Sequence, residues 1–276
     1  MLHNRRNDRI RQTVVAVSAV VAVVGAFVGS GAAGGTPIQD AAGGALGADS
    51  TLIAPAGPAF SIWSAIYLGL LAYAVWQFLP RQTSSPRQRR LGYPIAVTLL
   101  LNAAWILSVQ AGLLALSAVV IVVLLVALLM TFVLVVRTRQ RSARGWRAIV
   151  EAIVVDGTVG LYLGWVCVAT AANITALLSD AGFDGWGLAP DAWGVLIVVV
   201  AGVAGLALAI FGAGRLAPTA SLAWGLVWVA VSRTTGTLPS ATVATAALAT
   251  AIALVVATVV IRLVDVARAR RHVAGA

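Results

Sequence analysis

The sequence predicts an all-α, polytopic membrane protein with about eight transmembrane helices. Hydrophobic residues make up 61% of the 276 residues and charged residues only 10%, whereas a soluble domain carries roughly 25% charged residues. Apolar runs of about 20 residues, the length of helix that crosses a bilayer core, recur along the chain. The charged residues lie mostly in the short segments between these runs. The chain therefore needs lipid, rather than water, around most of its surface.

Eight stretches are long and apolar enough to be predicted as membrane spans, and the seventh is the shortest. They are Thr13–Ala33, Phe60–Leu79, Pro94–Leu113, Leu116–Val136, Ile149–Leu177, Ala192–Gly212, Ala217–Ser232 and Ala241–Ile261. The loop between the first two spans, Thr36–Pro58, is rich in Gly and Ala. It is long enough either to fold over the mouth of a helix bundle as a lid or to stay flexible.

The first span has two interpretations. Its basic start and its small residues after the apolar run resemble a signal peptide with a cleavage zone. Gly25, Gly29 and Ala33, however, form a stripe of small residues at four-residue spacing, which suits close packing of two helices. This stripe favours a helix that is retained in the protein.

The arginines predict the orientation. With eight spans, all of the 19 basic residues except Arg233 fall on one side of the membrane. The positive-inside rule assigns that side to the cytoplasm, so we expect both termini to be cytoplasmic and the protein to lie in a cell membrane. The net charge of +10 then reflects orientation rather than a nucleic-acid partner, because the arginines do not gather on one face.

The usual chemistry of enzymes is missing from the sequence. Both histidines, His3 and His272, lie in the tails, and the single Cys167 lies inside a predicted span. No phosphate-binding loop, nucleophile elbow or metal-spaced cluster occurs. The glycines at 29, 31 and 34 match G-x-G-x-x-G, but no strand precedes them, so the dinucleotide-binding interpretation fails. We expect no conventional enzyme, no resident cofactor and no metal.

Polar and aromatic side chains lie inside three of the predicted spans, one turn apart on a shared face of each helix. They are Trp63 and Tyr67, Asn102 and Trp105, and Trp165, Ala169 and Asn173. A polar side chain in hydrocarbon needs a partner, so these faces should point into the bundle. Together they would enclose an aromatic-walled cavity for a flat apolar ligand. Packing of the rings between helices is the alternative, and spacing alone slightly favours it.

Two carboxylates lie in the fifth predicted span. Glu151 follows Arg147 by one helical turn, so the two are expected to form an ion pair near the membrane boundary. Asp156 lies deeper and is a candidate proton-coupling residue, although a structural hydrogen-bonding role explains it equally well.

Three motifs resemble those of the TspO/MBR family, the tryptophan-rich sensory proteins related to the mitochondrial translocator protein. Residues 162–173 read Y-L-G-W-V-C-V-A-T-A-A-N and resemble that family's W-x-x-x-A-T-x-x-N signature. Residues 101–105, L-N-A-A-W, resemble its L-N-x-x-W motif. Residues 58–63, P-A-F-S-I-W, with a tyrosine four residues after the tryptophan, resemble the opening of its second helix. The chain differs from the family at Ser61 and Leu161, where proline is usual. With three additional helices and the stretch P-A-G-x-x-F-S-I-W at residues 55–63, it more closely resembles a longer branch of the family.

The resemblance implies a five-helix bundle with a ligand pocket under the first loop. We therefore divide the chain into a bundle, residues 1–178, and an extension of three further helices, residues 179–276. The pocket would bind a porphyrin, a sterol or another flat hydrophobic molecule. Carried over residue by residue, the site consists of Trp63, Tyr67, Asn102, Trp105, Trp165, Ala169 and Asn173.

Three functions are compatible with this sequence. The first is a membrane sensor or transporter that binds a small hydrophobic, porphyrin-like ligand. The second is a proton-coupled permease or exporter in which Asp156 carries the proton. The third is a structural or regulatory membrane subunit, and a homodimer through the glycine-rich helix faces is one form of it.

Overall fold

The computed structural model describes residues 2–29, 36–38, 40–139 and 145–274, and within these ranges it contains helices and no strand. The long helices are α1 (Leu2–Gly29), α2 (Ile62–Trp76), α4 (Pro86–Gln110), α5 (Leu114–Thr138), α7 (Thr158–Asp180), α8 (Pro190–Phe211), α9 (Leu216–Thr235) and α10 (Ala241–Ala274). Two short helices, α3 (Pro80–Thr83) and α6 (Trp146–Glu151), and a π-helical segment, Ala152–Gly157, lie between them. The predicted all-α fold is confirmed.

Seven helical stretches within the described ranges are long and apolar enough to cross a membrane, so the chain is an integral membrane protein. They coincide with the predicted spans except for the seventh. That span is the 20-residue helix α9, which is about 30 Å long and can cross a bilayer core. It falls short in hydropathy because it contains polar residues such as Thr219, Ser221 and Ser232, and these are buried. Protein rather than lipid surrounds them.

The helices form two compact units. Unit 1 consists of Met1–Leu46 and Ser61–Val159, and unit 2 consists of Gly47–Phe60 and Gly160–Ala276. The first loop is therefore divided between the units, and the second boundary lies inside α7. The division at residue 178, between a bundle and an extension, rests on the family resemblance and stays a prediction.

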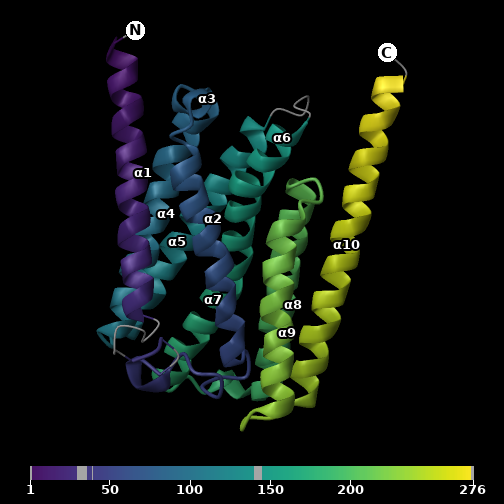
Figure 1. The fold of residues 1–276 in the computed structure, drawn as a ribbon. Coiled ribbons are helices and arrows are strands. Elements are labelled where there is room, and N and C mark those ends of the chain that lie inside the picture. Colours follow the sequence, from purple (N-terminus) through teal and green to yellow (C-terminus); the bar gives the residue numbers. More distant parts are fainter. Residues whose placement is uncertain (1, 30–35, 39, 140–144, 275–276) are drawn as a thin grey trace. The chain divides into compact units, whose positions relative to one another are not determined.

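In unit 1, α4 packs against α1 on one side and against α5 on another (Figure 1). A Cβ added at Gly25 would lie 3.5 Å from Cβ of Ala103, and one added at Gly29 would lie 2.4 Å from Cγ2 of Ile106. The small-residue stripe of α1 therefore lets α4 approach closely. Ala33, the third residue of that stripe, is outside the described ranges.

The first turns of α1 are held by buried polar contacts. Arg11 is only 2% exposed, and it donates to Oε1 of Gln77 at 3.2 Å and to the carbonyl of Thr83 at 2.8 Å. Asp8 accepts two hydrogen bonds from Arg89, at 2.7 and 2.6 Å. From the sequence, Arg11 and Arg89 indicate only the orientation of the chain in the membrane. In the structure they also connect α1 to the segment between α2 and α4.

In unit 2, α9 packs against α10 and α8, and α8 also packs against α10 (Figure 1). The core of this unit includes Val198, Leu222, Leu226 and Val243. The first half of α7 meets α9 at Gly164. A Cβ added there would lie 2.0 Å from the carbonyl oxygen of Pro218, so only a glycine lets the two backbones come this close.

Candidate functional site

Four of the seven predicted ligand residues meet in unit 1. Trp63 and Tyr67 of α2 stack with ring centroids 5.4 Å apart, and Trp63 stacks on Trp105 of α4 at 6.4 Å. Asn102, which is fully buried, donates from Nδ2 to the hydroxyl of Tyr67. We call these four residues the α2–α4 aromatic cluster. The one-turn spacing on each helix predicted their shared faces, and the structure brings the two faces together.

Two polar atoms of this cluster have no hydrogen-bond partner. Oδ1 of Asn102 and Nε1 of Trp105 are buried and unpaired among the described residues. Buried polar atoms are almost always paired, because an unpaired one loses its bond to water and gains nothing in return. One atom is an acceptor and the other a donor, so a small molecule with both functions would satisfy them. Trp63 and Tyr67 are only half-buried and give the cluster an accessible side.

The other three predicted ligand residues lie on α7, in unit 2. Trp165 is 1% exposed and makes an edge contact with Phe60, at 5.7 Å between ring centroids. Asn173 is fully buried, and Ala169 is half-buried. A single pocket that unites these three residues with the α2–α4 aromatic cluster stays a prediction.

The second part of the first loop, residues 47–60, is fastened to α9. The indole of Trp224 donates to the carbonyl of Ala59 at 2.9 Å, and the amide of Ala56 donates to the carbonyl of Trp228 at 3.1 Å. Arg233, only 1% exposed, donates to the carbonyls of Ala48 and of Leu238. The sequence left open whether this loop is ordered. In unit 2 it is held by side chains of the extension.

Arg233 was the one basic residue that the orientation rule left on the opposite side, and that was the available signal of a special role. A guanidinium in an otherwise apolar environment is retained where it has specific partners. Here the partners are the backbone carbonyls of Ala48 and Leu238, together with the hydroxyl of Ser232. Arg233 therefore binds the first loop, at Ala48, to the C-terminal end of α9.

The two carboxylates of the fifth predicted span meet at one arginine. Arg87 of α4 contacts Glu151 at 2.5 Å through Nη1 and Asp156 at 2.9 Å through Nη2. In an α-helix these carboxylates would point about 140° apart, because five residues at 3.6 per turn overshoot a full turn. The π-helical segment Ala152–Gly157 has a wider turn, which brings residues five apart onto one side. The local π-helix thus allows both carboxylates to reach Arg87.

The predicted ion pair between Glu151 and Arg147 is wrong. Arg147 instead lies over the ring of Trp146, at 5.4 Å from its centroid. The α-helical spacing of the two residues is as assumed, but the prediction ignored cations from other helices, and the guanidinium of Arg87 binds Glu151 instead. Asp156 also pairs with Arg139 at the end of α5. The candidate proton-coupling residue is therefore bound by two arginines in this structure.

Comparison with known proteins matches residues 15–260 to the family model described as TSPO-like protein. No curated protein and no solved structure matches the chain. The match includes the region of the three sequence motifs, and it also covers α8, α9 and most of α10. The three motifs lie before residue 178, and the family match extends beyond them into the three further helices. The chain belongs to the TSPO-like family.

Proposed function

We propose that this integral membrane protein binds a small, flat, hydrophobic molecule, porphyrin-like in shape, and that it serves as a sensor or transporter of that molecule rather than as an enzyme. The observation that carries this proposal is the α2–α4 aromatic cluster with its two unpaired buried atoms. Stacked rings offer a flat ligand a large contact area. The unpaired acceptor and donor would fix its orientation.

The residues on α7 form the second part of the proposal. Trp165, Ala169 and Asn173 would add a further aromatic face and a further amide to the ligand site, as the family resemblance implies. The support for their inclusion is that the bulky Trp165 and the polar Asn173 are both buried within unit 2. Polar groups at membrane depth are costly and are retained where they have a function.

Titration of the detergent-purified protein with protoporphyrin tests the proposal. Binding is followed by quenching of tryptophan fluorescence in the wild type and in a Trp105→Phe/Trp165→Phe double variant. The matched control is Trp146→Phe/Trp186→Phe, because it also removes two of the nine tryptophans, and both are exposed, at 69% and 80%. We expect saturable quenching that is at least tenfold weaker in the first variant and unchanged in affinity in the control.

The same titration has a result that would reject this ligand class. If the folded wild type shows no saturable quenching, or if both double variants bind as it does, protoporphyrin does not bind at these residues. Circular dichroism of each variant distinguishes a lost site from a lost fold.

A proton-coupled permease is the alternative, and no specific observation favours it. Asp156 is held by Arg87 and Arg139, which is the arrangement of a structural ion pair. The alternative predicts that Asp156→Asn abolishes transport in vesicles while ligand binding persists. A structural or regulatory subunit would instead show neither effect and would be recovered with a partner protein.

A further inference from the structure

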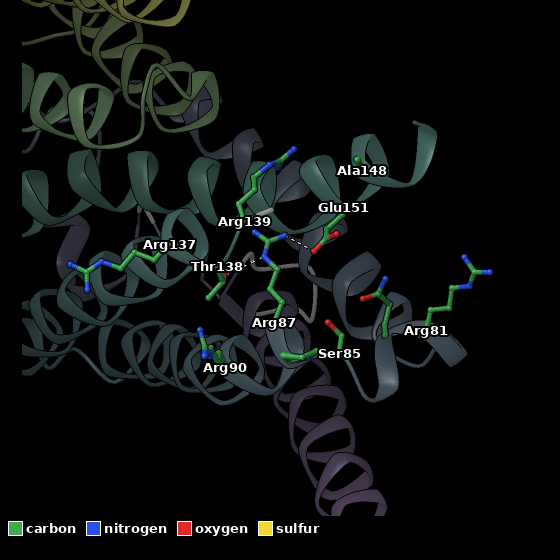
Figure 2. Close-up of a pocket in the computed structure, with 11 residues that line it drawn as sticks. Arg81, Ser85, Arg87, Arg90, Arg137, Thr138, Arg139, Ala148 and Glu151 are labelled. Atoms are coloured by element: carbon green, nitrogen blue, oxygen red, sulfur yellow. Dashed lines mark hydrogen bonds and ion pairs between the residues drawn. The ribbon is translucent and has the colours of Figure 1, made fainter. Parts of the chain in front are cut away.

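A pocket of about 460 Å³ opens in unit 1 where α4 begins and α5 ends. Five arginines line it, namely Arg81, Arg87, Arg90, Arg137 and Arg139, together with one acidic residue, Glu151. Figure 2 shows Arg87 in the middle, joined to Glu151 and Thr138, with the other arginines spread around it. None of the ligand residues discussed above lines this pocket.

The charges in and beside the pocket do not balance. Glu151 and Asp156 serve as partners of Arg87 and Arg139. Arg81, Arg90 and Arg137 have no ion-pair partner in the described part of the chain, and all three are exposed. Long, exposed arginines can change rotamer at small cost, so they can turn toward an anion that enters. The pocket therefore holds more positive charge than its own carboxylates neutralise.

The start of α4 increases this imbalance. Arg87 and Arg90 lie in the first turns of the helix, and its first turn contains no acidic residue. The N-terminal end of a helix carries a partial positive charge and free backbone N–H groups, which disfavour cations and favour anions. An anion bound at this end would relieve the repulsion and accept hydrogen bonds from both the backbone and the guanidinium groups.

The carboxylate of Glu151 shows how an oxygen anion can be bound by Arg87 in this pocket. This carboxylate contacts Nη1 of Arg87 at 2.5 Å, while 27% of the Glu151 side chain remains exposed. The planar guanidinium matches phosphate as well as carboxylate oxygens. A pocket of this volume is also large enough for a phosphorylated small molecule or a lipid headgroup.

We propose that this arginine pocket binds a phosphate group, with Arg87 at its centre and with Arg90 and Arg137 closing on the phosphate oxygens. The arginine distribution predicts that this end of unit 1 faces the cytoplasm. Two kinds of molecule could supply a phosphate group on that side of the membrane. One is the phosphate monoester of an anionic lipid, and the other is a soluble phosphorylated compound.

The experiment uses the full chain in phosphatidylcholine nanodiscs at fixed ionic strength. The first arm measures binding of radiolabelled inorganic phosphate by equilibrium dialysis. The second arm adds phosphatidic acid to the nanodisc lipids, extracts the protein with detergent, and counts the phosphatidic acid retained by native mass spectrometry. Phosphate bound in the first arm indicates a soluble source, and retention in the second arm alone indicates a lipid source.

An Arg90→Gln/Arg137→Gln variant and a matched control decide whether the pocket is the site. The control, Arg268→Gln/Arg270→Gln, removes the same charge from exposed positions near the end of α10. We expect binding to weaken at least tenfold in the first variant, because each lost guanidinium removes a charge-assisted hydrogen bond, and to stay within about twofold in the control. Equal losses in both variants, or no binding in either arm, would overturn the proposal.

Glu151→Gln supplies a test of the opposite sign. It removes the carboxylate that competes for Arg87, so binding should become several-fold tighter while the Arg90→Gln/Arg137→Gln variant becomes weaker. Binding that is weaker in Glu151→Gln than in the wild type would contradict a phosphate group at Arg87. The melting temperature of each variant without ligand shows whether it folds normally.

Discussion

The contact between α7 and α9 predicts that one added methyl group at Gly164 destabilises the protein. A Cβ at this position would lie 2.0 Å from the carbonyl oxygen of Pro218 and 2.2 Å from Oγ of Ser221. A close carbon–oxygen contact is about 3.3 Å or longer, so the helices must move apart by roughly 1.3 Å. The obstructing oxygen belongs to the backbone and cannot rotate away, as a flexible side chain would.

The size of the effect follows from two opposing contributions. Inserting a methyl group into a well-packed interface costs about 1–3 kcal/mol, and occasionally more. Alanine is the better helix former, which returns about 1 kcal/mol. Because a backbone atom and a side-chain oxygen both obstruct the methyl, the upper part of the first range applies. We therefore expect Gly164→Ala to lower the free energy of unfolding by about 2 kcal/mol.

Gly25→Ala is the matched control, since it is the same substitution inside another transmembrane helix. Its Cβ would meet Cβ of Ala103 at 3.5 Å, which is an ordinary contact. Only the helix-propensity gain remains, so this variant should be as stable as the wild type or more stable, by up to about 1 kcal/mol. The two variants are thus expected to have opposite signs.

Unfolding in detergent micelles by increasing amounts of sodium dodecyl sulfate, followed by circular dichroism, measures both variants. The reasoning fails if Gly164→Ala unfolds at the same denaturant fraction as the wild type, because α7 and α9 then do not pack as described. It also fails if Gly25→Ala is destabilised equally. That result would mean that glycine is needed for flexibility and not for close approach.

Three further predictions concern the loop and the ion pairs. Trp224→Phe removes a hydrogen bond to the loop and should increase amide hydrogen exchange within residues 47–60, with a loss of about 1 kcal/mol in stability. Arg233→Met removes the guanidinium that donates to the carbonyls of Ala48 and Leu238 and should cost about 1–3 kcal/mol, measured by the same denaturant titration. Asp156→Asn breaks two ion pairs and leaves Arg87 with one carboxylate, so it should lower stability by about 1–3 kcal/mol whether or not transport is affected.

Much of the fold could be predicted because the bilayer imposes simple rules. Length and hydropathy located every helix that the structure describes as long enough to cross a membrane. Helical spacing also predicted the faces of α2 and α4 that form the aromatic cluster, since residues one turn apart share a face. Periodicity cannot say which faces of different segments meet, so the edge contact of Trp165 with Phe60 was beyond its reach.

The errors have identifiable physical causes. Glu151 was assigned to Arg147 because the two lie one turn apart in α6, but its partner, Arg87, is on another helix. Arg11 was taken as an orientation signal, although it is buried and bonded to Gln77 and Thr83. Both cases depend on tertiary contacts between segments more than 60 residues apart in the chain. Local sequence patterns do not carry that information.

The low hydropathy of α9 explains the structural role of the extension. A transmembrane helix in contact with lipid on most sides has to be apolar, so α9 could become more polar only where other helices cover it. It uses this polarity at Trp224 and Arg233, which bond to backbone carbonyls of residues 47–60. Ser232 of the same helix also donates to the carbonyl of Ala48. The extension therefore supports the first loop, and deleting α8 to α10 should release it.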